Sequence, residues 1–176
     1  MSALIPGLVR WLPTSTPLIN RSIAARACVD IGLVEEPPGS NRSPTIDSYL
    51  NAVGSPLGSA WCAAAVSAWF RDCGAVIPAA AAGSCESWHS MGKVRGRLTL
   101  TPQPGYAVLY DLAGDGYADH MGVVVRTDPL ILTVEANTIM KRQAGNEREG
   151  VGCTIGMVLT ARVISYIIPE PIGVAP

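Results

Sequence analysis

Charged side chains are scarce in this sequence. They make up 15% of its 176 residues, whereas a typical globular domain contains about 25%. Thirteen Lys and Arg are balanced by fourteen Asp and Glu, which gives a formal net charge of -1. This balance provides no overall field that would attract nucleic acid or an anionic membrane surface. We therefore expect no nucleic-acid partner.

Long apolar runs are also absent. No stretch of about 18 consecutive apolar residues occurs, so the sequence predicts no membrane-spanning helix. The first twenty residues are interrupted by Pro6, Arg10, Pro13 and Pro17. They lack the apolar segment of about 7–15 residues that a secretory signal needs. We expect the protein to be made in the cytoplasm without a Sec signal, so that another route must deliver it to any substrate outside.

The cysteines lack the spacing of a closed disulfide framework or of a four-thiolate zinc site. Their number is odd and they include no Cys-x-x-Cys pair: Cys28, Cys62, Cys73, Cys85 and Cys153. Cys85 and His89 are four residues apart, which suits a ligand pair on a helix, but no third and fourth ligand lie nearby in the sequence. We predict at least one free thiol and no zinc site.

Motifs for other cofactors are missing or incomplete. No GxxxxGKS/T motif and no strand-borne GxGxxG motif occurs, so nucleotide binding is not predicted. A stretch that begins at Asp111 is similar to a calcium loop, but Ala113 and Gly122 stand where an EF-hand needs ligands. We therefore expect no cofactor and no bound metal.

The apolar content is sufficient for one well-buried core. Hydrophobic residues account for 48% of the sequence, and a chain of this length suits a single domain. Helical spacing predicts helices over residues 20–31, 46–53, 61–72 and 79–91, the last with Pro78 in its first turn. Runs of β-branched residues predict strands over residues 107–110, 120–127, 131–138 and 157–168, with turns at 114–116, 128–129 and 145–152.

The order of these elements predicts the fold class. Helices that come first and an antiparallel meander that follows argue for an α+β domain, in which N-terminal helices pack on a C-terminal antiparallel sheet. We assign residues 1–19 to an N-terminal extension, residues 20–169 to a single domain, and residues 170–176 to a Pro-rich tail.

Cys62 is the candidate nucleophile. It falls in the first turn of a predicted helix, where free backbone N–H groups and the helix dipole stabilise a thiolate. The preceding loop, residues 55–60, is rich in small residues, so a substrate can approach closely, and the Cys62 amide can serve an oxyanion. The alternative is an unreactive core cysteine, an interpretation that suits Cys28, Cys73 and Cys153 better.

His120 is the candidate general base. It lies where a glycine-rich and acidic loop, residues 114–119, gives way to an apolar strand. Its ring is therefore expected to reach the sheet surface and still contact solvent. The alternative is a surface histidine in a loop.

Glu135 and Asn137 are polar residues placed late in a strand of β-branched residues. Residues two apart project from one face of a strand. A hairpin that joins this strand to that of His120 would let Glu135 accept from a ring N–H, as enzymes with a Cys, a His and a third residue require. Asn137 could do the same or polarise a substrate carbonyl. The alternative is that this face of the strand is solvated.

The order of these candidates resembles that of the CHAP-type cysteine amidase and peptidase domains, which belong to the papain-like bacterial cell-wall hydrolases. The likeness covers residues 24–169. It comprises the stretches Gly32-Leu-Val-Glu35-Glu-Pro-Pro-Gly39-Ser-Asn41, the helix 46–54, Trp61-Cys62-Ala63-Ala64, residues 84–92 with Trp88, Pro104-Gly105, His120-Met121-Gly122-Val123-Val124 and Val134-Glu135-Ala136-Asn137-Thr138.

The resemblance implies a papain-like peptidoglycan hydrolase that cuts an amide bond of the stem peptide or cross-bridge. In that scheme Cys62 attacks the amide carbonyl, and His120 removes the thiol proton and later protonates the amine. Glu135 orients His120, with Asn137 in support. Peptidoglycan is then the partner, with an immunity protein or a delivery machine as further candidates. The protein would act on the cell wall after a holin or a secretion system has delivered it there.

The chain departs from the family pattern near the site. Tyr106 stands where the family usually has Asp, and Ala136 where it has Gly. Residues 53–61 contain no acid, so the calcium site that some members form ahead of the nucleophile is not expected. Two alternatives stay open. One is a catalytically idle module that binds wall peptide or builds a phage or secretion particle, and the other is a cysteine hydrolase of another amide.

Overall fold

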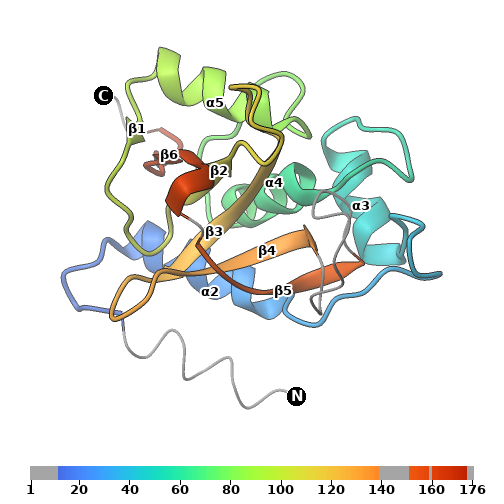
Figure 1. The fold of residues 1–176 in the computed structure, drawn as a ribbon, viewed down its shortest axis with the longest axis horizontal. Helices are drawn as coiled ribbons and strands as arrows, with labels where there is room; N and C mark the ends of the chain where they lie inside the picture. The colour runs from blue at the N-terminus through green and yellow to red at the C-terminus, as the bar shows by residue number, and fades with distance from the viewer. Residues whose placement is uncertain (1–11, 139–150, 159, 174–176) are drawn as a thin grey trace.

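The computed structural model describes residues 12–138, 151–158 and 160–173, which form an α+β fold (Figure 1). The helices in these ranges are α2 (Leu18–Val29), α3 (Pro44–Ala52), α4 (Cys62–Asp72) and α5 (Cys85–Val94), with a short 3-10 helix, η1 (Thr160–Arg162). The strands are β1 (Leu98–Thr99), β2 (Ala107–Tyr110), β3 (His120–Arg126), β4 (Leu132–Thr138), β5 (Gly152–Met157) and β6 (Val163–Ile167). The predicted fold class is confirmed at this level. None of the helices described is long and apolar enough to cross a membrane.

Helices α2, α3 and α4 begin and end within two residues of their predicted ranges. Local signals explain the agreement. The side chain of Ser43 accepts a hydrogen bond from the backbone N–H of Ile46 over 3.2 Å, and Pro44 occupies the first position of α3. Helix α4 is rich in alanine, which has the highest helix propensity.

The predicted start of the last helix is wrong. Helix α5 begins at Cys85, six residues after the predicted start at 79, because Ser84 accepts from the backbone N–H of Ser87 and so caps the helix there. Ala81 has a left-handed backbone with φ of 50°, which interrupts any helix through the alanine-rich stretch. Pro78 therefore lies outside the helix.

All strand pairs of the six-stranded sheet are antiparallel, in the order β1-β6-β2-β3-β4-β5. Strands β2, β3 and β4 form the meander as predicted, but β5 was not predicted and the single strand predicted over 157–168 is wrong. Strand β5 ends at Met157, and β6 crosses back to pair with β2, where Tyr166 and Ile167 become buried. Gly152, assigned to a turn, belongs to β5, and the rest of that turn lies mostly outside the described residues.

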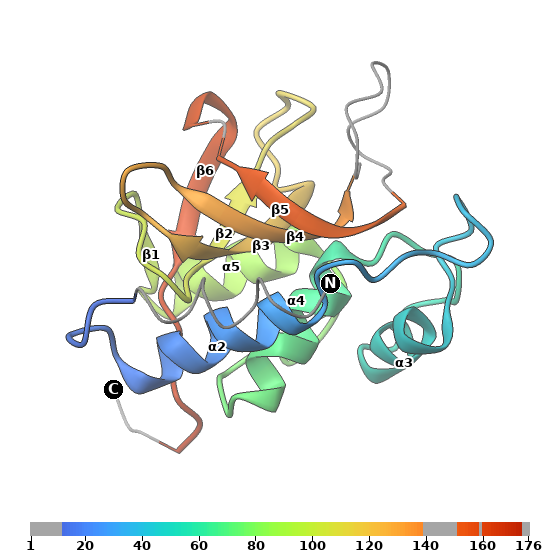
Figure 2. The same cartoon turned by 90° about the horizontal axis from the view of Figure 1, so that it is seen from below.

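Helices α2 and α4 lie against one face of the sheet (Figure 2). The side chains buried between the layers include Ile23 from α2, Trp69 from α4, and Leu109 and Met121 from the sheet. Neighbouring strand residues point the other way, and Val108 joins a second cluster on the opposite face. Burying each large apolar side chain stabilises the fold by about 1.5–3 kcal/mol.

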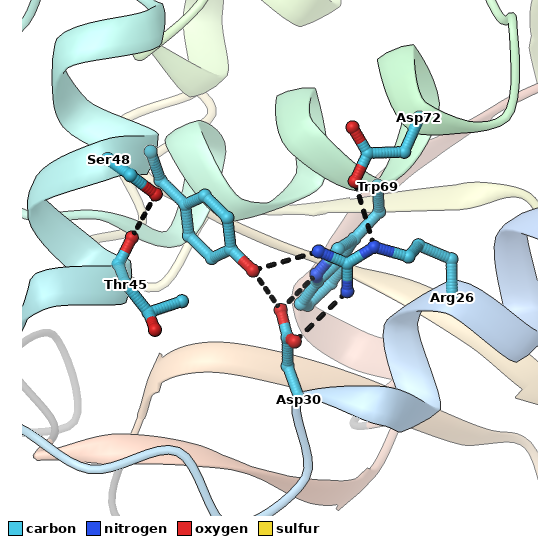
Figure 3. A network of polar contacts seen from close by, with 7 residues as sticks. Arg26, Asp30, Thr45, Ser48, Trp69 and Asp72 are labelled. Carbon is cyan, nitrogen blue, oxygen red and sulfur yellow. Dashed lines mark hydrogen bonds and ion pairs between the residues drawn. The ribbon is translucent and has the colours of Figure 1, made fainter.

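A partly buried polar network joins α2, α3 and α4 (Figure 3). Arg26 donates to Asp72 over 2.9 Å, to Asp30 over 3.0 Å and to the Tyr49 hydroxyl over 2.9 Å. Tyr49 and the indole N–H of Trp69 each donate to Asp30 over 2.6 Å. Burial, followed by the hydrogen bond to Asp30, raises the pKa of Tyr49 to about 12. This network anchors the C-terminal half of α4, the helix that begins with Cys62.

Candidate active site

Cys62 is the first residue of α4, one position after the predicted helix start. Its side chain is buried, with 6% of the residue exposed. The backbone N–H of Ala63 donates to the Cys62 sulfur. Because the first amides of a helix have no partner within the helix, they are available to a thiolate or to an oxyanion beside it.

The loop that leads into α4 is attached to a buried carboxylate. Glu35, which is only 2% exposed, accepts from the indole N–H of Trp61 over 3.0 Å and from the backbone N–H of Asn41 over 2.9 Å. The side-chain amide of Asn41 in turn donates to the carbonyl of Gly58 over 3.2 Å. Glu35 therefore fixes two loops at once, and one of them ends at Cys62.

His120 is the first residue of β3 and faces both Cys62 and Glu135. Its Nε2 lies 3.3 Å from Oε2 of Glu135, and its ring also forms a hydrogen bond with Cys62. Since Nε2 is directed at Glu135, Nδ1 is the ring nitrogen available to the sulfur. His120 is only 4% exposed. The expectation that its ring contacts solvent is therefore wrong, as is the alternative of a surface histidine.

Glu135 receives two further hydrogen bonds. The hydroxyls of Tyr110 and Thr133 each donate to Oε1 over 2.8 Å. The Tyr110 ring also stacks on the His120 ring, with centroids 5.8 Å apart and planes inclined by 26°. Sequence reasoning gave neither residue a role. It placed Thr133 on the same face of the strand as Glu135, two residues before it, but did not predict the hydrogen bond.

Two glycines on neighbouring strands make room for the Glu135 side chain. A Cβ atom on Gly122 of β3 would lie 2.8 Å from Cγ of Glu135 and 2.7 Å from the carbonyl oxygen of Val134. A Cβ atom on Gly156 of β5 would lie 2.9 Å from Oε1 of Glu135. All three distances are shorter than real Cβ contacts, so a side chain at either glycine would force the Glu135 side chain to shift.

Cys62, His120 and Glu135 stabilise one another's charged forms. The pKa of Cys62 lies well below its usual range, chiefly because of a hydrogen bond with Cys85 and then because of His120, although burial opposes the shift. Burial favours neutral His120, but its hydrogen bonds with Cys62 and Glu135 prevail and raise its pKa to about 10. Burial alone would raise the pKa of Glu135, but the hydrogen bond with His120 outweighs burial and the pKa is lowered. A thiolate, an imidazolium and a carboxylate result.

Asn137 occupies a different local structure from the one expected. It has a left-handed backbone with φ of 54°, and the pairing of β4 with β5 shifts register between Glu135 and Thr138. The simple alternation that would place it on the face of Glu135 is interrupted there. The side chain is 1% exposed, and its Oδ1 has no hydrogen-bond partner among the described residues. Asn137 therefore does not hold the His120 ring through this oxygen.

The structure gives Cys85 a partner that the sequence did not indicate. Its Sγ lies 3.7 Å from Sγ of Cys62, whereas Nδ1 of His89 faces Glu86 at 3.6 Å. Cys85 and His89, whose spacing alone would suit a ligand pair, therefore face different partners. One local signal was present in the sequence: Ser84 before Cys85 is a helix cap, so both cysteines begin helices.

The remaining cysteines lie away from this pair. Cys28 and Cys153 are fully buried, as expected of core residues, and burial raises the pKa of Cys28 to about 11. Cys73 follows the C-terminus of α4 and is only partly buried. Within the described ranges, no three His, Cys, Asp or Glu side chains are grouped to hold a metal ion.

Comparisons of this chain with protein-family models, with curated proteins and with solved structures find no match.

Proposed function

We propose that the protein is a papain-like cysteine hydrolase of the CHAP type, which cleaves an amide bond in the stem peptide or cross-bridge of peptidoglycan. The series of contacts from Cys62 through His120 to Glu135 supports the chemical part of this proposal. The substrate class rests on the sequence motifs that resemble those of CHAP domains over residues 24–169.

The reaction begins with the Cys62 thiolate. Its sulfur attacks the amide carbonyl carbon, and the carbonyl oxygen takes up the negative charge. Amide N–H groups at the start of α4, such as that of Ala63, are placed to stabilise this oxyanion. The His120 imidazolium then gives its proton to the departing nitrogen as the C–N bond breaks. A thioester on Cys62 and a free amine are formed.

Water completes the cycle. Neutral His120 accepts a proton from a water molecule whose oxygen attacks the thioester. The C–S bond breaks, the carboxylic acid leaves and Cys62 is again a thiolate beside an imidazolium. Glu135 keeps Nε2 of His120 protonated throughout, so that Nδ1 is the nitrogen that exchanges protons with the reacting groups. Asn137 remains a proposed supporting residue.

The proposed substrate places the activity at the bacterial cell wall. The bond is either the link between muramic acid and alanine or a peptide bond within the stem or bridge. Delivery by a holin or a secretion system, with an immunity protein as a further partner, belongs to the same proposal.

Digestion of purified sacculi tests the proposal directly. We expect the protein to release fragments whose masses, determined by mass spectrometry, identify one type of cleaved amide bond. Cys62→Ala should abolish the release, whereas Cys73→Ala at the far end of α4 should leave it unchanged. Fragment release by Cys62→Ala equal to that of the unaltered protein would refute the thiol mechanism.

The same experiment separates the two alternatives. Binding to sacculi without fragment release would support a catalytically idle wall-binding module. Absence of both binding and release, together with Cys62-dependent cleavage of other amide or isopeptide substrates, would support a cysteine hydrolase with a different substrate.

A further inference from the structure

Two thiols share the centre of the candidate site. Sγ of Cys85 lies 3.7 Å from Sγ of Cys62, within hydrogen-bond distance for sulfur. The two residues are 6% and 7% exposed, so bulk water does not replace this contact. A thiol is a weak donor to a neutral acceptor, but a hydrogen bond to an ionised acceptor is about twice as strong. The contact therefore favours one thiol and one thiolate.

Both cysteines occupy the first position of a helix. Cys62 begins α4 and Cys85 begins α5, so the positive ends of two helix dipoles meet at the sulfur pair. This arrangement stabilises one negative charge on the pair. A second negative charge at 3.7 Å would be repelled by the first, so the pair retains one proton.

The surrounding charges decide which sulfur keeps that proton. His120 of β3 forms a hydrogen bond with Cys62, and this cation favours a thiolate on Cys62. The carboxylate of Asp119, just before β3, disfavours a thiolate on Cys85. On α5 itself, Glu86 is directed at the backbone N–H of Ala118 and at His89. The pKa of Cys85 is raised well above its usual range, first by its hydrogen bond with Cys62 and then by burial.

We propose that Cys85 is a positioning residue for the Cys62 nucleophile. The S–H of Cys85 donates a hydrogen bond to Sγ of Cys62 and holds that sulfur as a thiolate. The inference rests on the proposed thiol-hydrolase function and adds a residue to it. Cys85 does not touch the substrate in this scheme. It lowers the pH at which the nucleophile becomes ionised.

Removal of the donor has a specific signature. Without the Cys85 proton, Cys62 ionises at higher pH, so less thiolate is present in mildly acidic solution. Once formed, the thiolate is no less reactive, because nucleophilicity rises with thiol pKa. The acidic limb of the pH profile should therefore move to higher pH, while the rate on the plateau is maintained or increased. A general packing defect would instead lower the rate at every pH.

The experiment follows alkylation of Cys62 by iodoacetamide between pH 4 and pH 9, with the modified peptide quantified by mass spectrometry. Cys85→Ala removes the donor, and Cys85→Ser keeps a hydroxyl donor of similar size. We expect Cys85→Ala to shift the inflection by at least one pH unit, which corresponds to about tenfold slower alkylation on the acidic limb. Cys85→Ser should restore most of the original profile, and the control Cys73→Ser should match the unaltered protein.

Two results would overturn the inference. One is a Cys85→Ala profile that superimposes on that of the unaltered protein, and the other is an equal shift in Cys85→Ala and Cys85→Ser. If Cys85→Ala fails to fold by circular dichroism, Cys85→Val fills the space without a donor and takes its place in the comparison. Alkylation requires no peptidoglycan, so failure to cleave sacculi leaves this test intact.

Discussion

The indole N–H of Trp61 donates to the buried carboxylate of Glu35 over 3.0 Å, one residue before the cysteine that begins α4. The other carboxylate oxygen accepts from the backbone N–H of Asn41. Glu35 is therefore an acceptor on both oxygens. Its position in the chain is distant from Cys62, but its hydrogen bond holds the indole of Trp61, the residue just before α4.

We predict that Glu35→Gln destabilises the protein by about 1–3 kcal/mol, because the new NH₂ group faces an N–H donor and leaves buried polar groups unpaired. Cys62 alkylation should also slow, since Trp61 loses its fixed position. Urea unfolding and alkylation kinetics measure the two effects. The neighbouring exposed residue provides a matched control, and Glu36→Gln should change the free energy of unfolding by less than about 0.5 kcal/mol.

The two glycines beside Glu135 predict a second effect. Gly156→Ala places a methyl group 2.9 Å from Oε1 of Glu135 and from Oγ1 of Thr133, so the carboxylate must shift. We expect at least a tenfold loss of hydrolysis of sacculi with the strand still folded. Ile155→Ala is the control on the same strand, because this side chain is 37% exposed and points to the other face. Equal activity in Gly156→Ala and the unaltered protein would contradict the claim that a side chain at position 156 displaces the Glu135 carboxylate.

The pH dependence of activity should show a plateau. It begins above the depressed pKa of Cys62 and ends as His120 loses its proton at a pKa of about 10. Both limits belong to the coupled pair of groups. In Glu135→Gln the carboxylate charge that favours the imidazolium is lost, so the alkaline limit should move to lower pH. Plateau activity should fall by about 10², and an unchanged alkaline limit would contradict the role of Glu135.

Tyr110→Phe separates the hydrogen bond of Tyr110 from its ring contact. The phenyl ring still stacks on His120, but Oε1 of Glu135 loses one of its two hydroxyl donors. A hydrogen bond to a charged group contributes about 1.5–3 kcal/mol, so kcat/KM should fall by roughly ten to one hundred times if the loss is fully expressed in the transition state. Tyr117→Phe, at an exposed position in the loop before β3, is the control. A Tyr110→Phe variant as active as this control would exclude a contribution from the hydroxyl.

Much of the fold could be predicted from local patterns. Helices α2, α3 and α4 carry apolar spacing and end signals of their own, and β2, β3 and β4 consist of short apolar runs bounded by turns. Local patterns failed where two states compete over the same residues. The alanine-rich stretch after Pro78 has high helix propensity, yet the Ser84 cap starts the helix later. The run 157–168 looks continuous, yet Met157 ends the edge strand β5, whereas residues 163–167 form β6 between β1 and β2 on the other side of the sheet.

Local sequence features were enough to predict the α+β class and to identify Cys62, His120 and Glu135 as candidates, because a helix start, a strand start and a polar strand position can each be recognised from neighbouring residues. Only the tertiary structure brought Cys85 to Cys62 across 23 residues, Glu35 to Trp61 across 26 and Tyr110 to Glu135 across 25. Such contacts depend on how helices and strands pack against one another, and side-chain burial then sets their strength. Scarce charge predicted no polyanion partner, whereas the placement of a few buried charges produced the candidate site.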